Sequence, residues 1–173
     1  MAKERFNAID IANWFLWKNE VERIENENEL NDYEVYEKLT HLKLQKLIYF
    51  AQGMYLAFTR NSLFEENIEA WEHGPVVRTV YDKFKTYKKL DIDKKLTSSE
   101  LDTIKEIEKD EEISEILNLV YDNYGGYTAW QLRELSHVPG GPWQVTVATK
   151  GMNSEIEHKL MIEYFSQYII ANG

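Results

Sequence analysis

The sequence predicts an all-α fold: a mainly helical single globular domain over residues 1–173, with at most one short β-strand pair near residues 68–72. Three observations support this prediction. Apolar residues recur at helical spacing through most of the chain, with no internal repeat or domain boundary. The length of 173 residues suits one domain. A hydrophobic content of 43% supplies a packed core, which argues against disorder.

The first predicted helix begins near Asn7 or Asp10, since either side chain can cap a helix. Its apolar positions are Ile11, Ala12, Phe15 and Leu16. The following stretch, from Glu25 to Asp32, repeats Asn and Glu and therefore predicts a loop.

The second predicted helix is the most informative element, and it runs through LTHLKLQKLIYFAQGMYLAF, from Leu39 to Phe58. Apolar residues cover nearly all of its sides, which is typical of a helix at the centre of a domain. Thr40 is the expected cap. Gly53 lowers helix stability by up to about 1 kcal/mol, so we expect it to permit close approach of another element.

Three polar side chains interrupt this apolar helix, namely Gln45, Lys46 and Gln52. A buried polar group without a partner costs a few kcal/mol, so these side chains need partners. The seam that they form is therefore either a hydrogen-bonded core network or a functional site. Lys46 and Gln45 could also bind a carboxylate or a backbone group of a partner.

The middle of the chain predicts a strand, a turn and a helix. Alternation from Ile68 to Glu72 indicates a short strand or extended arm. His73 and Gly74 then turn the chain, and Pro75 suits the first turn of a helix because its missing N–H would be unpaired there. That helix would place Val76, Val80, Tyr81, Phe84 and Tyr87 on one side. Residues 91–95 form a charged connector.

The remaining third predicts helices joined by short turns. One helix begins at Thr97 or Ser98. A second helix has apolar residues at helical spacing from Ile113 to Tyr124, and it ends at Gly125 and Gly126. Thr128 caps a short helix, and residues 139–142 form a turn or loop. The last helix would start at Asn153 or Ser154, with Glu157 near a capping-box position. Its inward-facing residues would be Ile156, Leu160, Phe165 and Ile169.

Composition excludes several classes of site. The chain has no cysteine, so disulfides and thiolate metal sites are impossible. Its four histidines lack the two-histidine helical spacing of metalloenzymes, so we expect no metal and no cofactor. The N-terminal residues mix charges into apolar positions, unlike a signal peptide, and no stretch is long enough to span a membrane. These features predict a cytoplasmic protein.

The net charge of −10 is unevenly distributed. Acidic residues dominate from Glu20 to Glu37 and from Glu100 to Glu115, whereas residues 78–95 are rich in lysine. These runs are either solvated helix faces or opposite-sign surfaces that orient a partner. Stable binding to nucleic acid is not expected. Mimicry of nucleic acid by the acidic faces is a further alternative.

No catalytic motif is present in the sequence. It lacks the Gly-x-Ser-x-Gly elbow of hydrolases and the glycine-rich phosphate loop of nucleotide-binding proteins. We therefore predict that the chain is not an enzyme. The alternative is a small enzyme that uses the seam of Gln45 and Lys46 together with His73.

Aromatic and histidine residues gather beside turns. His73 and His137 each precede a turn rich in Gly and Pro, where an imidazole can either lock the local backbone or contact a partner. Trp71, Trp130 and Trp143 also lie near turns, and tryptophan is common both in cores and at interface hot spots. Trp143 is the one expected to be partly exposed.

Several stretches together resemble the Panacea domain, a module of prophage-associated and toxin-neutralising proteins. They are KLQKLIYFAQG (43–53), IEAWEHGPVV (68–77), YTAWQLRELSHVPGGPW (127–143) and the closing helix with IEYF (162–165). The resemblance extends from about Phe6 to about Ile169, so that residues 1–173 would form a single Panacea-like domain.

The resemblance implies an antitoxin that neutralises a cognate protein toxin by direct binding, in a phage-associated toxin–antitoxin system. A proteolytic adaptor that delivers the toxin to a protease is the alternative that the family also implies. We expect the partner to bind the surface around residues 71–78 and 137–143, and a homodimer is left open. The expected partner-binding residues are Trp71, His73, Arg78, His137, Trp143 and Lys46.

Overall fold

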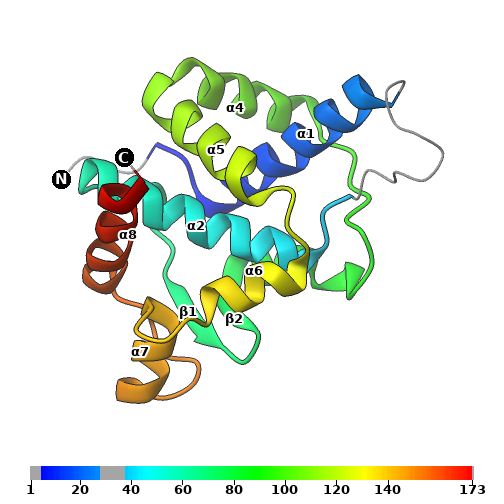
Figure 1. Ribbon diagram of the computed structural model, residues 1–173. Helices are drawn as coiled ribbons and strands as arrows, with labels where there is room; N and C mark the ends of the chain where they lie inside the picture. Colours follow the sequence, from blue (N-terminus) through cyan, green and yellow to red (C-terminus); the bar gives the residue numbers. More distant parts are fainter. Residues whose placement is uncertain (1–4, 28–37, 173) are drawn as a thin grey trace.

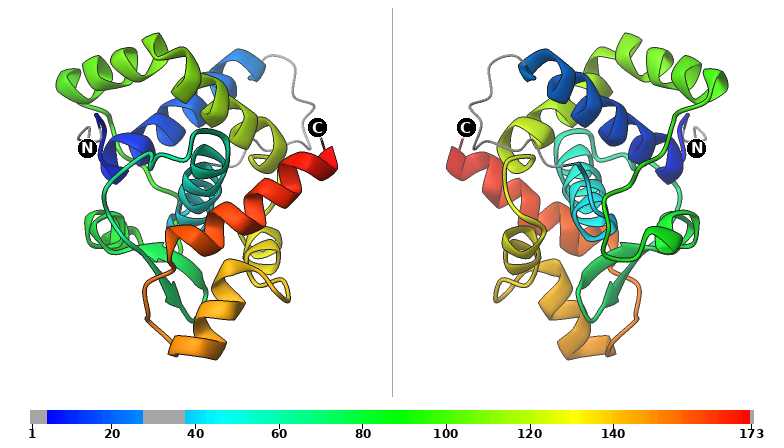
Figure 2. Two further views of the ribbon diagram at one scale, coloured as in Figure 1. Left: turned by 90° about the vertical axis from the view of Figure 1, so that its left-hand side faces the viewer. Right: turned by 90° about the vertical axis from the view of Figure 1, so that its right-hand side faces the viewer.

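Helix α2 (His41–Thr59) lies at the centre of the fold (Figure 1). The structure is a computed structural model that describes residues 5–27 and 38–172. Elements from both halves of the chain contact α2: α1 (Ala8–Asn26), β2 (Gly74–Val77), α5 (Glu111–Tyr124), α6 (Ala129–Ser136) and α8 (His158–Asn172). Figure 2 views α2 nearly end-on, with α1, α4 (Ser98–Lys109) and α5 on one side and the hairpin, α6 and α7 on the other. The predicted mainly helical class is confirmed.

The central position of α2 follows from its sequence. Thr40 caps the helix, since its hydroxyl accepts a hydrogen bond from the Lys43 N–H. Apolar and polar residues alike are buried along its length. Gly53 lies against the ring of Phe165 on α8, and a Cβ at this glycine would stand 2.1 Å from a ring carbon. The predicted close approach at Gly53 is therefore confirmed.

The helices on the α1 side begin where side chains cap them. Asn7 caps α1 in a reciprocal capping box with Asp10, so the two predicted candidates act together. Thr97 and Glu100 form the same arrangement before α4, and Asp110 caps α5. The prediction of a loop from Glu25 was wrong at its start, because α1 continues to Asn26; residues 28–32 of that loop lie outside the described residues.

Strands β1 (Ile68–Trp71) and β2 form an antiparallel hairpin in which Glu69 faces Val76 and Trp71 faces Gly74. The strand predicted from Ile68 is confirmed. Pro75 does not open a helix; it lies in β2, and α3 (Arg78–Phe84) begins three residues later. Proline is tolerated here because its register partner Ala70 directs its N–H and carbonyl to residues 153–154 instead of to β2, so no ladder hydrogen bond is lost. The short 3₁₀ helix η1 (Lys85–Tyr87) follows.

The C-terminal region differs from the prediction in two ways. An unpredicted helix, α7 (Pro142–Lys150), starts within the expected turn, with Pro142 in its first turn. The last helix begins at His158 instead of near Ser154, because residues 153–156 run alongside β1. There Ala70 donates to the Ser154 carbonyl at 2.8 Å, and Ile156 donates to the Ile68 carbonyl at 2.8 Å. Backbone pairing with the hairpin therefore overrides the helical spacing.

Candidate functional site

The structure brings together the two segments in which we expected the partner-binding residues. The indole N–H of Trp143, in the first turn of α7, donates to the carbonyl of Trp71 at 2.7 Å. Nε2 of His137, just after α6, lies 3.3 Å from the carbonyl of Glu72. The hairpin and the α6–α7 connection therefore form one continuous surface, which we call the hairpin face and define by residues 69–78 and 137–143.

His137 is held by contacts on several sides. Its Nδ1 lies 2.7 Å from the carbonyl of Arg133, and its ring centroid lies 3.8 Å from that of Trp143. Burial lowers the pKa of His137 below its ordinary value, and the hydrogen bonds to the Arg133 and Glu72 carbonyls offset part of this effect. The ring thus locks the hairpin turn onto α6, which is the first of the two roles weighed from the sequence.

A charged and aromatic cluster covers the exposed side of the hairpin. The guanidinium carbon of Arg78 lies 5.3 Å from the centroid of the Trp71 ring, and its nitrogen is 3.0 Å from a carboxylate oxygen of Glu69. The Trp71 indole donates to the same carboxylate at 2.6 Å. The Arg78 side chain is 61% exposed, and His73 is exposed at the turn. This arrangement can offer a stacked cation and an imidazole to a partner.

Glu69 and Tyr81 complete this cluster, although neither was among the predicted partner-binding residues. Tyr81 packs against Trp71 at 4.8 Å between ring centroids. The signal for Glu69 was available, because residues two apart in a strand lie on the same face, which places Glu69 beside Trp71. Trp143 is half-buried, which agrees with its expected partial exposure, but Trp130 is more exposed at 61%.

The polar seam of α2 is a network that binds the backbone of neighbouring segments. Gln45 bonds Val77 of β2, whose N–H donates to Oε1 at 2.9 Å and whose carbonyl accepts from Nε2 at 3.2 Å. Gln52 holds the segment before β1 in the same manner, through the Leu63 N–H at 2.7 Å and the Phe64 carbonyl at 3.0 Å. Lys43 donates to the carbonyl of Gly125 at 2.6 Å. Each of these side chains therefore fixes a loop or strand to α2.

Lys46 occupies the seam beneath the hairpin and is fully buried. Its ammonium donates to the Pro75 carbonyl at 3.3 Å, and its stem packs so closely on Gly74 that a Cβ there would stand 2.5 Å from Cε. Burial, together with the smaller effect of the nearby Arg133 charge, lowers the pKa of Lys46 to about 7. Lys46 therefore supports the hairpin face from below.

The residues of the alternative enzyme do not meet in a common site. Gln45 and Lys46 are buried against β2, whereas His73 is exposed at the hairpin turn. Within residues 5–27 and 38–172, no group of three or more histidine, aspartate or glutamate side chains is placed to hold a metal ion. None of the helices described in the structure has the length and apolar character needed to cross a membrane.

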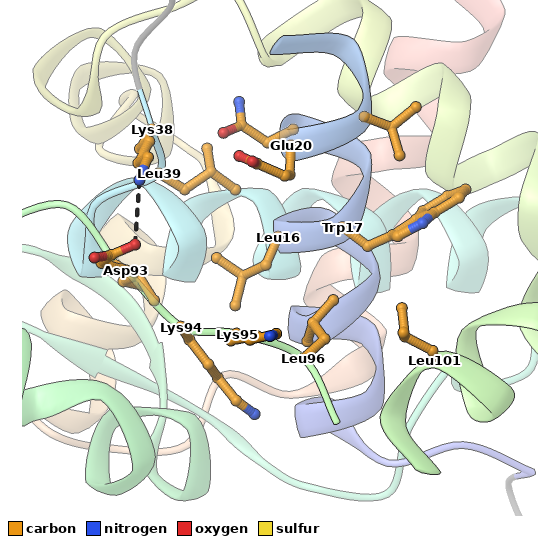
Figure 3. A pocket seen from close by; sticks show the side chains of 13 residues that line it. Leu16, Trp17, Glu20, Lys38, Leu39, Asp93, Lys94, Lys95, Leu96 and Leu101 are labelled. Carbon is orange, nitrogen blue, oxygen red and sulfur yellow. Dashed lines mark hydrogen bonds and ion pairs between the residues drawn. The ribbon is translucent and has the colours of Figure 1, made fainter. Parts of the chain in front are cut away.

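A groove of about 460 Å³ lies on another part of the molecule, between α1 and the connector at residues 92–96 (Figure 3). Apolar side chains share its lining with an ion pair between Lys38 and Asp93, 3.2 Å apart. The sequence predicted only a charged connector at residues 91–95. The missed signal was its period of two, which turns Ile92, Lys94 and Leu96 inward.

Comparison with known proteins identifies a family. The model of the antitoxin SocA-like Panacea domain matches residues 44–144, which run from α2 to the first turn of α7. The chain is also 37% identical over 119 residues to antitoxin SocA of Caulobacter vibrioides (strain NA1000 / CB15N). That match covers 66% of this chain and 63% of the relative. No solved structure matches.

Proposed function

The chain belongs to the antitoxin SocA-like Panacea domain family, and from this premise we propose that it is an antitoxin that binds its cognate protein toxin directly. The proposed setting is a cytoplasmic, phage-associated toxin–antitoxin pair, in which the chain makes and breaks no covalent bond. Stable binding to nucleic acid is not part of this proposal, because a net charge of −10 repels phosphate backbones.

The observation that carries the proposal is the composition of the hairpin face. Interface hot spots are enriched in tryptophan and arginine, and here Arg78 is exposed over the ring of Trp71. His73 lies beside this pair at the turn, and Trp143 borders it from α7. A toxin that covers these residues and their surroundings would bury a total area of about 1,200–2,000 Å².

The rigidity of the hairpin face also supports direct binding. Lys46 and Gln45 hold β2 from below, while His137 and Trp143 bond the turn from the side. A surface fixed before binding loses little conformational entropy in the complex, which favours affinity. In this proposal Arg78, His73 and the edges of the two tryptophans contact the toxin, while Lys46 positions them.

Co-expression with the product of the adjacent gene tests the proposal. We expect that product to arrest growth, the chain to restore growth, and the two purified proteins to form a complex. Arg78→Glu should weaken this complex at least tenfold, since it reverses an exposed charge of the hairpin face. Lys105→Glu, on the exposed side of α4, is the matched control and should leave affinity unchanged.

Toxin abundance separates the two modes of neutralisation. Under direct binding, the toxin accumulates in rescued cells at an undiminished level. If its level falls in rescued cells but recovers when the cellular proteases are deleted, the chain acts as a proteolytic adaptor. A product that neither arrests growth nor binds the chain would contradict the antitoxin proposal.

A further inference from the structure

The groove between α1 and the connector has the size of a small-molecule site. Its volume of about 460 Å³ falls within the range of about 300–1,000 Å³ that is usual for such sites. Its lining comes from elements other than the hairpin face, so the two surfaces are separate. We call it the α1 groove and define it by residues 16–17, 19–21, 38–39, 92–96 and 101.

Apolar side chains from four segments of the chain form much of the wall of the α1 groove. They are Leu16, Trp17, Leu39, Ile92, Leu96 and Leu101. Leu39 and Ile92 are buried, whereas Leu101 on α4 is 36% exposed and Trp17 on α1 is half-buried. A ligand that covered the partly exposed side chains would remove apolar surface from water, which favours binding.

The α1 groove has a charged end and an apolar end. In Figure 3 the charged side chains of Lys38, Glu20 and Asp93 lie toward one end of the groove. Trp17 and Leu101 lie toward the opposite end. This arrangement matches an elongated ligand that has a charged head and an apolar tail.

The charge that remains unpaired in the groove is positive. The Glu20 carboxylate accepts two hydrogen bonds from Arg23, at 2.9 and 2.7 Å. The Asp93 carboxylate pairs with Lys38 at 3.2 Å. Lys95 is exposed, and its ammonium pairs with no acidic side chain in the described part of the chain. The groove therefore offers a free cation, while both of its own carboxylates already have basic partners.

The connector that forms one wall of the groove is fixed before a ligand binds. The Ile92 N–H donates to the Leu39 carbonyl at 2.8 Å. The Lys94 ammonium pairs with the Glu100 carboxylate on α4, and Glu100 also forms the capping box with Thr97. A preformed groove binds its ligand without first having to order its own residues.

We propose that the α1 groove binds a small amphipathic carboxylate of the fatty-acid class. Its carboxylate lies against Lys95 and Lys38, and its apolar chain extends toward Trp17 and Leu101. Charge selects this ligand over a cationic amphiphile, because a cation would meet Lys95 and find both carboxylates of the groove already paired. This inference is independent of the antitoxin proposal, which concerns the hairpin face.

The first experiment compares three ligands with the same apolar chain by calorimetry, all below the concentrations at which they form micelles. They are dodecanoate, dodecanol and dodecylammonium. Dodecanoate should bind one molecule per chain and at least tenfold more tightly than dodecylammonium. Lys95→Glu should weaken dodecanoate binding at least tenfold. Lys89→Glu, at an exposed lysine outside the groove lining, is the matched control and should leave the affinity unchanged.

The second experiment tests the apolar end of the groove. Leu101→Asp should also weaken dodecanoate binding at least tenfold, whereas Leu90→Asp should not, since Leu90 is 72% exposed and lies outside the groove lining. Circular dichroism checks that both variants keep their helices. When dodecanoate is added to the isotope-labelled chain, the indole resonance of Trp17 should shift most among the five tryptophans.

Several results would overturn the inference. They are no binding of dodecanoate, equal binding of dodecylammonium, equal losses of affinity in the groove variants and their controls, and shifts confined to tryptophans other than Trp17. A dimer of the unmodified chain that Leu101→Asp dissociates would show that a second copy occupies the groove instead. The antitoxin proposal would survive each of these results, because none of them concerns binding of the toxin to the hairpin face.

Discussion

Gln45 on α2 hydrogen-bonds both backbone polar groups of Val77 on β2, as a neighbouring strand would do. The Val77 N–H donates to Oε1 at 2.9 Å, and Nε2 donates to the Val77 carbonyl at 3.2 Å. Lys46 bonds the Pro75 carbonyl two residues earlier on the same edge. Side chains of the central helix therefore close the edge of a hairpin that has no further strand to pair with.

Replacing Gln45 should destabilise the whole domain. Gln45→Leu keeps the volume of the side chain but leaves the buried N–H and carbonyl of Val77 without their partner. Because each of the two unpaired buried groups costs about 1–3 kcal/mol, we expect the free energy of unfolding to fall by about 2–6 kcal/mol. Urea unfolding followed by circular dichroism measures this loss. Gln167→Leu, at an exposed site on α8, should change stability by less than about 0.5 kcal/mol.

Gly53 permits the close contact between α2 and α8. Gly53→Ala improves helix propensity by about 1 kcal/mol, but its Cβ would stand 2.1 Å from the Phe165 ring. Overpacking of a core costs about 1–3 kcal/mol, so we expect net destabilisation in thermal unfolding. Gly126→Ala is the control, since a Cβ there would meet nothing within 4 Å. A Gly53→Ala variant as stable as the unmodified chain would contradict this close contact between α2 and α8.

The sequence predicted the central helix, its Thr40 cap and the close approach at Gly53, because spacing and propensity decide them locally. It did not predict that Pro75 belongs to a strand or that α8 starts at His158. The first outcome depends on the register of the hairpin, in which Pro75 faces Ala70, and the second on the pairing of β1 with residues 153–156, which are far away in the chain. Local rules place proline at a helix start but carry no information on which edge of a hairpin it will face.

The candidate site could also be predicted from the sequence only in part. Aromatic, histidine and Gly-Pro residues predicted a partner-binding surface at residues 71–78 and 137–143. The structure places these two segments side by side. The sequence left open whether Gln45 and Gln52 form a core network or a site. Only their buried backbone partners decide for the network, and those partners lie 11 to 32 residues away. The sequence also did not predict that Trp130 is exposed, since this depends on which side of α6 packs against the core.

Lys46 should make stability rise with pH in the alkaline range. Its pKa is about 7 in the folded chain and 10.5 without burial, so between these values the unfolded chain binds a proton that the folded chain does not. Stability therefore increases as pH rises from about 7 toward 10.5 and is independent of this group below pH 7. Relative to Lys46→Met, the unmodified chain should gain about 1 kcal/mol per pH unit in this window. Urea unfolding at pH 7, 8, 9 and 10 measures the difference, and parallel curves for the two proteins would refute it.

His41 should weaken the fold in acid. Neither of its ring nitrogens has a hydrogen-bond partner among the described residues, and the ring packs 5.2 Å from that of Tyr81. Burial, together with the charge of Lys46, lowers the pKa of His41 from 6.5 to about 4. As pH falls from 6.5 to 4, the unfolded chain gains a proton that the folded chain cannot hold, so stability is lost across this window and no further below it.

His41→Phe isolates this effect, because phenylalanine keeps the ring contact with Tyr81 and does not titrate. We expect the variant to become more stable than the unmodified chain as the pH is lowered, by about 1 kcal/mol at pH 4.5 relative to the difference at pH 8. The full shift would give more, but solvent screens a side chain that is only partly buried. Thermal unfolding of both proteins at pH 8, 6, 5 and 4.5 provides the measurement. A stability difference that stays constant across this series would show that His41 is protonated as readily in the folded chain as in the unfolded one.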